Sequence, residues 1–423
     1  MSRRLLGLFI FSILAFIIAF TYLFFLSPKA LFSPQHEVAS PLGKLTDRVG
    51  SIFLESTDQS QDTTFEVTPA DKQILTKIWP EPTAGHYIRL QQILVSVATT
   101  TASGTEATLQ TKATTTVVLF VDRATGHVHE YNRGSIRQIT NTTILGVYDA
   151  YFFDGGSSLL LRYKDPTSSL IKTVTATIPN TQENSSPLPL EKMSYLSDDI
   201  TSVAVSSKGV LAYSVSTDSE SVIYEIEKGK QSLVRVIPLR ELRLTYGGSN
   251  IYATTKPSAF IQGYVFNARS GERVFGGKTG LEFYPSDVPG LAIASMWSSS
   301  GLATFIQTQE SSFLSLKTLA EKCFWITDQT VLGCAVPTKL PFEDQGLPDD
   351  WHQGVATFDD TITVLYRELG TEGVAYNLKS LSGESIDVLR PLYNKQAEML
   401  SFINKRDGSL WVLNLSEYLN QPL

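Results

Sequence analysis

The chain has 423 residues, of which 42% are hydrophobic and 18% are charged. This length can hold one large domain or two smaller ones, and the low share of charged residues disfavours a protein built of surface helices, whose exposed faces need Lys and Glu. The formal net charge of −7 leaves no evident basic surface to neutralise phosphates, so nucleic acid is excluded as a partner.

The N-terminal residues predict a membrane anchor. Arg3 and Arg4 precede Leu5–Leu26, which contains no charged residue. As a helix of about 33 Å, this run is long enough to cross a hydrocarbon core of about 30 Å. A cleaved signal peptide is the alternative, but its apolar part is normally shorter. We therefore expect a single-pass protein of the cell membrane, with residues 1–4 in the cytoplasm, a transmembrane signal anchor at 5–26 and the rest of the chain outside.

Two segments with unusual amino-acid composition follow the anchor. Residues 27–66 are polar, contain several prolines and show no strong periodicity, which indicates a stalk in front of a folded domain at 67–423. The stretch "TTTASGTEATLQTKATTT" at 99–116 separates two apolar, strand-like runs. We expect it to be a long flexible loop between these strands.

A strand–turn–strand phrase recurs along the chain. In each copy a residue that can pack at the end of one strand precedes a tight turn and a second apolar strand; the copies begin at Phe153, Val205, Thr245, Trp297, Trp325 and Tyr393. Their mean spacing of about 48 residues is close to one four-stranded propeller blade. A short gap on one side of Trp325 and a long gap on the other indicate an insertion rather than a lost blade.

These repeats predict an all-β fold, a β-propeller. Seven blades are expected, with six or eight as alternatives. Only a short segment follows Tyr393, so the last blade lacks strands unless the N-terminal part of the domain contributes. Pairing of the two terminal segments would close the ring and remove exposed strand edges.

The only two cysteines lie in one predicted hairpin. If Asp328 and Gln329 form its tip, Thr327 faces Thr330, and the same register places Cys323 opposite Cys334. Directly opposed residues are close enough for a disulfide, which an oxidising compartment favours. Two free, buried thiols are the alternative.

A proline-rich segment at 337–354 accounts for the long gap and is expected to be an insertion loop. It ends in Asp349, Asp350, Trp351 and His352. An exposed Trp beside two carboxylates could stack on a sugar or dock a peptide, which would make this loop a site for a ligand or partner. Alternatively, Trp351 plugs the base of its own blade.

The phrase "MWSSSGLATFI", with Trp297, Ser298 and Gly301, resembles the WD40-like repeat of bacterial TolB-type propellers. The resemblance covers about residues 117–415. It implies the propeller fold, whereas propellers serve as adaptors, sugar binders and enzymes alike. The order of anchor, Thr-rich loop and "PDDW" also looks similar to uncharacterised membrane-anchored bacterial propellers.

Motifs that would indicate a reaction are incomplete. The sequence "GGKTG" at 276–280 lacks the first glycine of a phosphate-binding loop, and His127 and His129 have no evident further ligands for a metal. No G-x-S-x-G nucleophile motif occurs. The sequence therefore predicts no catalytic residue, no metal and no cofactor.

Together these features favour a membrane-tethered, extracytoplasmic β-propeller that acts as a non-catalytic binding or scaffolding module for proteins or cell-envelope material. The alternative hypothesis is an enzyme, a propeller hydrolase or lyase acting on polysaccharide or peptidoglycan. A third hypothesis is a purely structural spacer.

Overall fold

A computed structural model describes residues 73–100, 106–168, 170–181, 185–327, 330–340 and 346–419. The predicted anchor with Arg3 and Arg4 and the predicted stalk lie outside these residues. Within the described ranges, no helix has both the length and the apolar character needed to cross a membrane.

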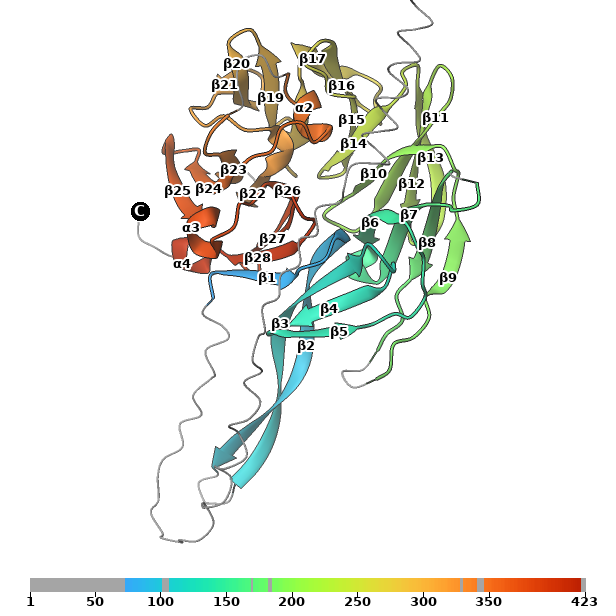
Figure 1. Ribbon diagram of the computed structural model, residues 1–423, viewed down its shortest axis with the longest axis vertical. Helices are drawn as coiled ribbons and strands as arrows, with labels where there is room; N and C mark the ends of the chain where they lie inside the picture. The colour runs from blue at the N-terminus through green and yellow to red at the C-terminus, as the bar shows by residue number, and fades with distance from the viewer. Residues whose placement is uncertain are drawn as a thin grey trace, which may run out of the picture. The chain divides into compact units, whose positions relative to one another are not determined.

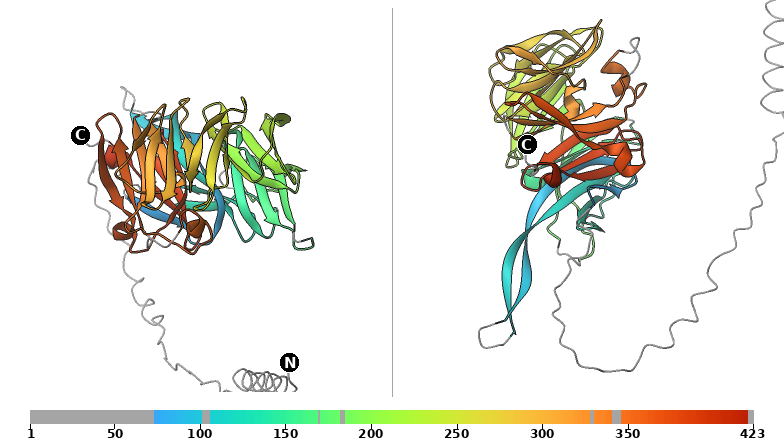
Figure 2. Two further views of the ribbon diagram at one scale, coloured as in Figure 1. Left: turned by 90° about the horizontal axis from the view of Figure 1, so that it is seen from above. Right: turned by 90° about the vertical axis from the view of Figure 1, so that its left-hand side faces the viewer.

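The described residues form seven four-stranded antiparallel sheets. Figures 1 and 2 show these sheets arranged as blades around a common centre. The chain is therefore an all-β propeller, and the prediction of seven blades is confirmed.

The blades have the following strands, named from the centre outward. Blade 1 has β2 (Thr83–Thr100), β3 (Glu106–Asp122), β4 (Val128–Asn132) and β5 (Ser135–Gln138); blade 2 has β6 (Val147–Phe153), β7 (Ser158–Lys164), β8 (Ile171–Thr177) and β9 (Glu191–Tyr195); blade 3 has β10 (Ile200–Val205), β11 (Leu211–Ser216), β12 (Ser221–Glu227) and β13 (Lys230–Ile237). Blade 4 has β14 (Leu242–Gly247), β15 (Asn250–Thr255), β16 (Gln262–Asn267) and β17 (Arg273–Thr279); blade 5 has β18 (Glu282–Pro285), β19 (Ala292–Ser298), β20 (Gly301–Gln307) and β21 (Ser311–Phe313). Blade 6 has β22 (Cys323–Thr327), β23 (Val331–Pro337), β24 (Asp360–Tyr366) and β25 (Thr371–Asn377); blade 7 has β26 (Val388–Asn394), β27 (Met399–Asn404), β28 (Leu410–Asn414) and β1 (Leu75–Trp79).

Four short helices of the described residues lie in connections between strands, and a fifth, α4, follows the last strand. They are η3 (Asp154–Gly156), η4 (Ala320–Lys322), α2 (Asp349–His352), α3 (Leu378–Ser382) and α4 (Ser416–Leu419).

The ring is closed by strands from opposite ends of the domain. β1 pairs antiparallel with β28, with Leu75 opposite Leu413, and becomes the outer strand of blade 7. Figure 1 shows the blue β1 beside the red blade. The expectation that the N-terminal part completes the last blade is confirmed.

The core consists of layers between neighbouring blades. One apolar cluster joins Val117 and Val121 of blade 1 to Val147 of blade 2, and other clusters join further pairs of blades. Because each sheet is covered on both faces, its strands can be apolar on both sides. Leu159, Leu160 and Leu161 are accordingly all fully buried although they are consecutive.

The Trp297 phrase occupies a different position within its blade from the other copies. Trp297 lies in the β19–β20 hairpin, which joins the second and third strands of blade 5, whereas Phe153, Val205, Trp325 and Tyr393 lie where the first strand turns into the second. The short gap before Trp325 therefore reflects this difference in phase. The long gap after it does contain an insertion, the connection from β23 to β24 in blade 6.

Residues 99–100 and 106–116 of the Thr-rich segment are paired strand, so the prediction of a long loop over 99–116 is wrong for these residues. β2 and β3 pair continuously from Thr83 opposite Asp122 to Thr100 opposite Glu106, apart from one irregularity near the start. Figure 1 shows this hairpin extending well beyond the body of the ring. Threonine is β-branched and favours extended backbone, so a Thr-rich sequence can continue the two flanking strands.

Candidate functional site: the central cavity

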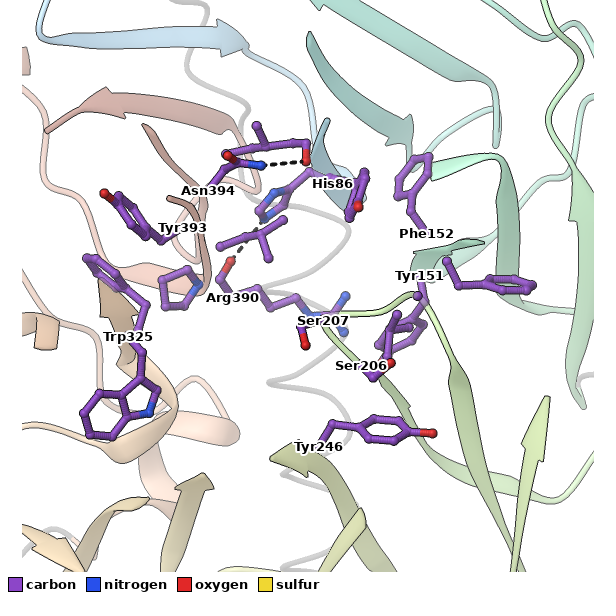
Figure 3. A pocket seen from close by; sticks show the side chains of 18 of the residues that line it. His86, Tyr151, Phe152, Ser206, Ser207, Tyr246, Trp325, Arg390, Tyr393 and Asn394 are labelled. Carbon is purple, nitrogen blue, oxygen red and sulfur yellow. Dashed lines mark hydrogen bonds between the residues drawn. The ribbon is translucent and has the colours of Figure 1, made fainter. Parts of the chain in front are cut away.

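A cavity of about 660 Å³ lies at the centre of the ring, and all seven blades contribute to its wall. The residues come from the innermost strands β2, β6, β10, β14, β18, β22 and β26 and from the turns that follow some of them. Figure 3 shows side chains from opposite sides of the ring pointing into this space. The propeller fold itself creates the cavity, because seven innermost strands surround one axis.

Aromatic side chains from five blades form much of the cavity wall. They are Tyr151, Tyr246, Tyr284, Trp325 and Tyr393, and each is half-buried. Burial, with a smaller contribution from Glu398, raises the pKa of Tyr393 to about 12. Burial also raises the pKa of Tyr151 and of Tyr246 above its usual value. These phenols are therefore neutral at physiological pH and offer flat, apolar faces.

The hydroxyl groups of two of these tyrosines are already engaged. Tyr151 donates to Asp149 Oδ2 at 3.0 Å, and Tyr246 donates to Glu225 Oε1 at 2.9 Å. Such bonds fix the orientation of the rings. The guanidinium of Arg390 lies over one face of Tyr151, 5.2 Å from the ring centroid. This wall suits sugar rings or the apolar side chains of a peptide.

Arg390 brings a positive charge into the cavity. It pairs with Asp149, which Arg162 Nη1 also contacts at 3.4 Å, so two arginines share one carboxylate. Arg390 has a φ of 52° at an irregularity in the pairing of β26 with β27. Bulges of this kind redirect a side chain. The Arg390 side chain keeps 38% of its surface exposed, because the cavity is open to water.

His86 lies in the same wall but both of its ring nitrogens are occupied. Nε2 is 3.1 Å from the carbonyl oxygen of Arg390, and Nδ1 is 2.9 Å from Ser401 Oγ. A carbonyl can only accept, so Nε2 carries the proton and Nδ1 accepts from the serine. Burial, and then the charge of Arg390, lowers the pKa of His86 to about 3. This imidazole is therefore neutral and is not placed to act as a base.

Sequence reasoning did not identify this cavity, although the signal was present. Trp325 and Tyr393 are two of the six repeat anchors, Tyr246 directly follows a third, and Tyr151 lies two residues before a fourth. The anchors were expected to pack at strand ends. Because the innermost strands surround the axis, part of each phrase except the one at Trp297 faces the cavity instead.

The two cysteines are joined in a disulfide across the β22–β23 hairpin, with Cys323 opposite Cys334. At the tip, Thr327 pairs with Val331 rather than with the expected Thr330, because the register shifts after Trp325. The Thr327 hydroxyl instead contacts the Thr330 hydroxyl at 2.6 Å. Both cysteines are fully buried and lie beside the cavity-lining residues of β22.

The proposed ligand loop at Asp349–His352 does not present an exposed Trp, and that expectation is wrong. Trp351 is fully buried, and its indole Nε1 donates to both carboxylate oxygens of Asp387, at 3.0 and 2.9 Å. Asp349 accepts from the amide of Ala259 and Asp350 accepts from the amide of Gly346. Trp351 thus fills the interior, as the alternative stated, and the two carboxylates fix loops.

Among known proteins, this chain is similar to several solved structures, all with low sequence identity. No protein-family model matches the chain, and no curated protein does. An oligogalacturonate lyase in complex with manganese is 10% identical, with a TM-score of 0.48, over 79% of this chain and 100% of that one. The β-propeller domain of the Trilobed protease from Pyrococcus furiosus is 8% identical, with a TM-score of 0.45, over 71% of this chain and 91% of that domain. A catalytically inactive virginiamycin B lyase from Staphylococcus aureus with quinupristin is 11% identical, with a TM-score of 0.42, over 78% and 100%. The protein's own sheet topology defines its class: it is a seven-bladed β-propeller.

Proposed function

We propose that this protein is a non-catalytic binding module that holds protein or cell-envelope material in its central cavity. The observation that supports this most directly is the wall of half-buried aromatic rings contributed by five blades. Rings from separate blades are fixed by the whole ring of sheets, so little side-chain freedom is lost when a ligand stacks on them.

The polar groups of the cavity are consistent with binding rather than reaction. Asp149 is shared by Arg390 and Arg162, and both nitrogens of His86 are hydrogen-bonded. Each group is already committed to a partner in the protein. The arrangement favours a rigid receptor whose charge is weakly positive near Arg390.

The same proposal places the propeller outside the cell membrane, tethered by Leu5–Leu26 with Arg3 and Arg4 in the cytoplasm. The long apolar run and the disulfide-bonded pair of cysteines support this location, since disulfides persist in oxidising compartments. Its ligand is then a protein or a glycan of the cell envelope.

The alternative is a hydrolase or lyase that acts on polysaccharide or peptidoglycan. One observation favours it: Glu282, Glu321 and His352 bring two carboxylates and an imidazole together at one place in the ring. Release of shortened fragments from envelope glycans by the purified full chain would support this alternative and contradict the proposal.

Site-specific photo-crosslinking tests the proposal. The full-length protein, in its native membrane, carries p-benzoylphenylalanine in place of Trp325 inside the cavity or in place of Trp297 as the control outside it. We expect the probe at position 325 to capture a protein or glycan that the probe at 297 does not, and Tyr246→Ala to weaken this capture. Equal capture at both positions, or none at 325, would reject the cavity as the binding site.

A further inference from the structure

Three side chains that commonly bind metals meet away from the aromatic wall. Glu282 begins β18, Glu321 lies in η4 just before β22, and His352 ends α2 in the insertion of blade 6. One ligand atom from each can be chosen so that all three lie within 4.8 Å of one another. Residues from three separate parts of the chain therefore converge at one point.

The contacts around His352 are asymmetric. Its Nε2 lies 3.2 Å from Glu282 Oε1, while its Nδ1 lies 3.6 Å from Glu321 Oε1. The Glu282 side chain is only 4% exposed. Within the described ranges its one ion-pair partner is His352, and its other hydrogen bonds, from Ser295 Oγ and the amide of Glu321, are long at 3.4 and 3.5 Å.

These distances select one tautomer of His352. A proton on Nε2 lets the ring donate to the buried carboxylate of Glu282. Arg243 Nη2, also 3.2 Å from Nε2, then faces an N–H, but the Arg243 side chain is 38% exposed and can donate to water and to Glu321. In the opposite tautomer Nε2 would accept from Arg243, but the buried Glu282 would face a lone pair, and Nδ1–H would point across 3.6 Å, too far for a hydrogen bond. We therefore place the proton on Nε2, which leaves a lone pair on Nδ1.

Nδ1 of His352 faces Oε1 of Glu321 at a distance of 3.6 Å. The Glu321 oxygen is buried and has no hydrogen-bond partner, whereas Arg243 Nη1 contacts the other oxygen of the same carboxylate at 3.3 Å. Two lone pairs thus face each other across 3.6 Å. Ligand atoms bound tetrahedrally to one zinc ion at about 2.0–2.2 Å lie about 3.4 Å apart, so a metal fits this gap.

We propose that His352 Nδ1 and Glu321 Oε1 bind a divalent transition metal of the zinc type, with solvent completing the coordination. Glu282 accepts the Nε2 proton and orients the imidazole, as carboxylates do behind many metal-bound histidines. Imidazole with carboxylate suits zinc better than calcium or magnesium, which prefer oxygen ligands alone. The bound ion would fasten α2 to η4, which directly precedes blade 6, and the hydrogen bond from His352 to Glu282 would link the site to blade 5.

Zinc titration of the full chain tests this site. The protein is purified in detergent without a histidine tag, treated with EDTA and dialysed, and zinc binding is then measured by calorimetry and elemental analysis. We expect one zinc ion per chain and a rise in melting temperature on its addition. His352→Gln and Glu321→Gln should abolish both effects, and Glu282→Gln should weaken binding by about 10–100-fold.

His127→Gln is the matched control, because among the described residues the one hydrogen bond of the His127 ring is to Thr143 and the residue lies outside the proposed site. Its zinc affinity should equal that of the unaltered protein. Absence of zinc binding, or binding that survives in both His352→Gln and Glu321→Gln, would overturn the proposal. Glu321 keeps 32% of its side chain exposed, so its variant should fold even if the histidine variant does not.

Discussion

His86 shows how the central cavity determines the ionisation of one residue. Its pKa falls from 6.5 to about 3, first because the ring is buried and second because Arg390 is close. In the unfolded chain the same ring takes up a proton near pH 6.5. Between these two values the unfolded state binds more protons than the folded state, so acid favours unfolding.

We therefore expect the free energy of unfolding to fall as the pH drops from 7 towards 4, with His86 contributing to this fall. The contribution is absent above pH 6.5 and grows as the pH approaches 3. Urea unfolding at pH 7.5 and pH 5 should show a smaller loss of stability in His86→Asn than in the unaltered protein. All other titrating groups are common to both proteins, so an equal loss in the two would show that His86 does not titrate in this way.

At the scale of structural elements, the inserted segment of blade 6 is held by a buried polar cluster. Lys322 is fully buried, and its Nζ lies 2.7 Å from Asp360 and 2.5 Å from Asp387. Trp351 donates to Asp387 and lies over the same ammonium group, 4.9 Å from Nζ to the ring centroid. Burial raises the pKa of Asp360 to about 6, with Lys322 opposing and Asp387 adding to the rise.

Trp351→Phe should therefore destabilise the protein although it keeps an aromatic ring. The phenyl ring retains part of the apolar contacts, leaves some space unfilled and removes a donor from the buried carboxylate of Asp387. We expect a loss of about 1–3 kcal/mol in the free energy of unfolding, measured by urea denaturation. Trp297→Phe, at a half-buried position, is the control and should cost less. A cost for Trp351→Phe no larger than the control would mean that the hydrogen bond contributes little.

The blades could be predicted because their sequence pattern repeats. The long β2–β3 hairpin could not, because its Thr-rich composition is also typical of loops. Each blade repeats one strand–turn–strand phrase, so several imperfect copies were enough to infer the architecture and the terminal closure. Residues 99–116 are polar, and polar Thr-rich sequence is shared by loops and by hairpins. Only the pairing of Thr100 with Glu106 and its neighbours distinguishes them.

The site was harder to predict because its residues meet only in the ring. The opposition of Cys323 and Cys334 depends on a single hairpin, and counting residues was sufficient. Arg390 enters the cavity through an irregular strand, and Trp351 is buried because Asp387 of the next blade offers it an acceptor. The partners, Asp149 for Arg390 and Asp387 for Trp351, are distant in the chain and cannot be recognised from the sequence next to either residue.

At the scale of the whole molecule, the pairing of β1 with β28 joins the two ends of the propeller. Leu75 and Ile78 of β1 are 6% and 4% exposed, and they pack in separate apolar clusters that involve blade 7. All other blades consist of strands consecutive in the chain, so only this pairing must close a loop that contains nearly the entire ring. Closing a long loop costs the unfolded chain more entropy than closing a short one.

A covalent bond across this closure should stabilise the protein more than a similar bond within one blade. Thr76 lies opposite Val412 in the β1–β28 pair, and Thr361 lies opposite Asn377 in the local β24–β25 pair. With cysteine at both positions of a pair, the chain-entropy relation gives about 6 kcal/mol for the closing bond and about 3 kcal/mol for the local one. Both proteins retain the native Cys323–Cys334 bond.

Thermal unfolding of the oxidised and reduced forms would measure the difference, with mass spectrometry verifying which bonds have formed. Reduction also breaks the native disulfide, so the unaltered protein, oxidised and reduced, supplies the correction. We expect the T76C/V412C pair to raise the melting temperature more than the T361C/N377C pair, and to slow unfolding if the ring opens first at blade 7. An equal rise in both would show that the length of the closed loop does not determine the stabilisation, contrary to this prediction.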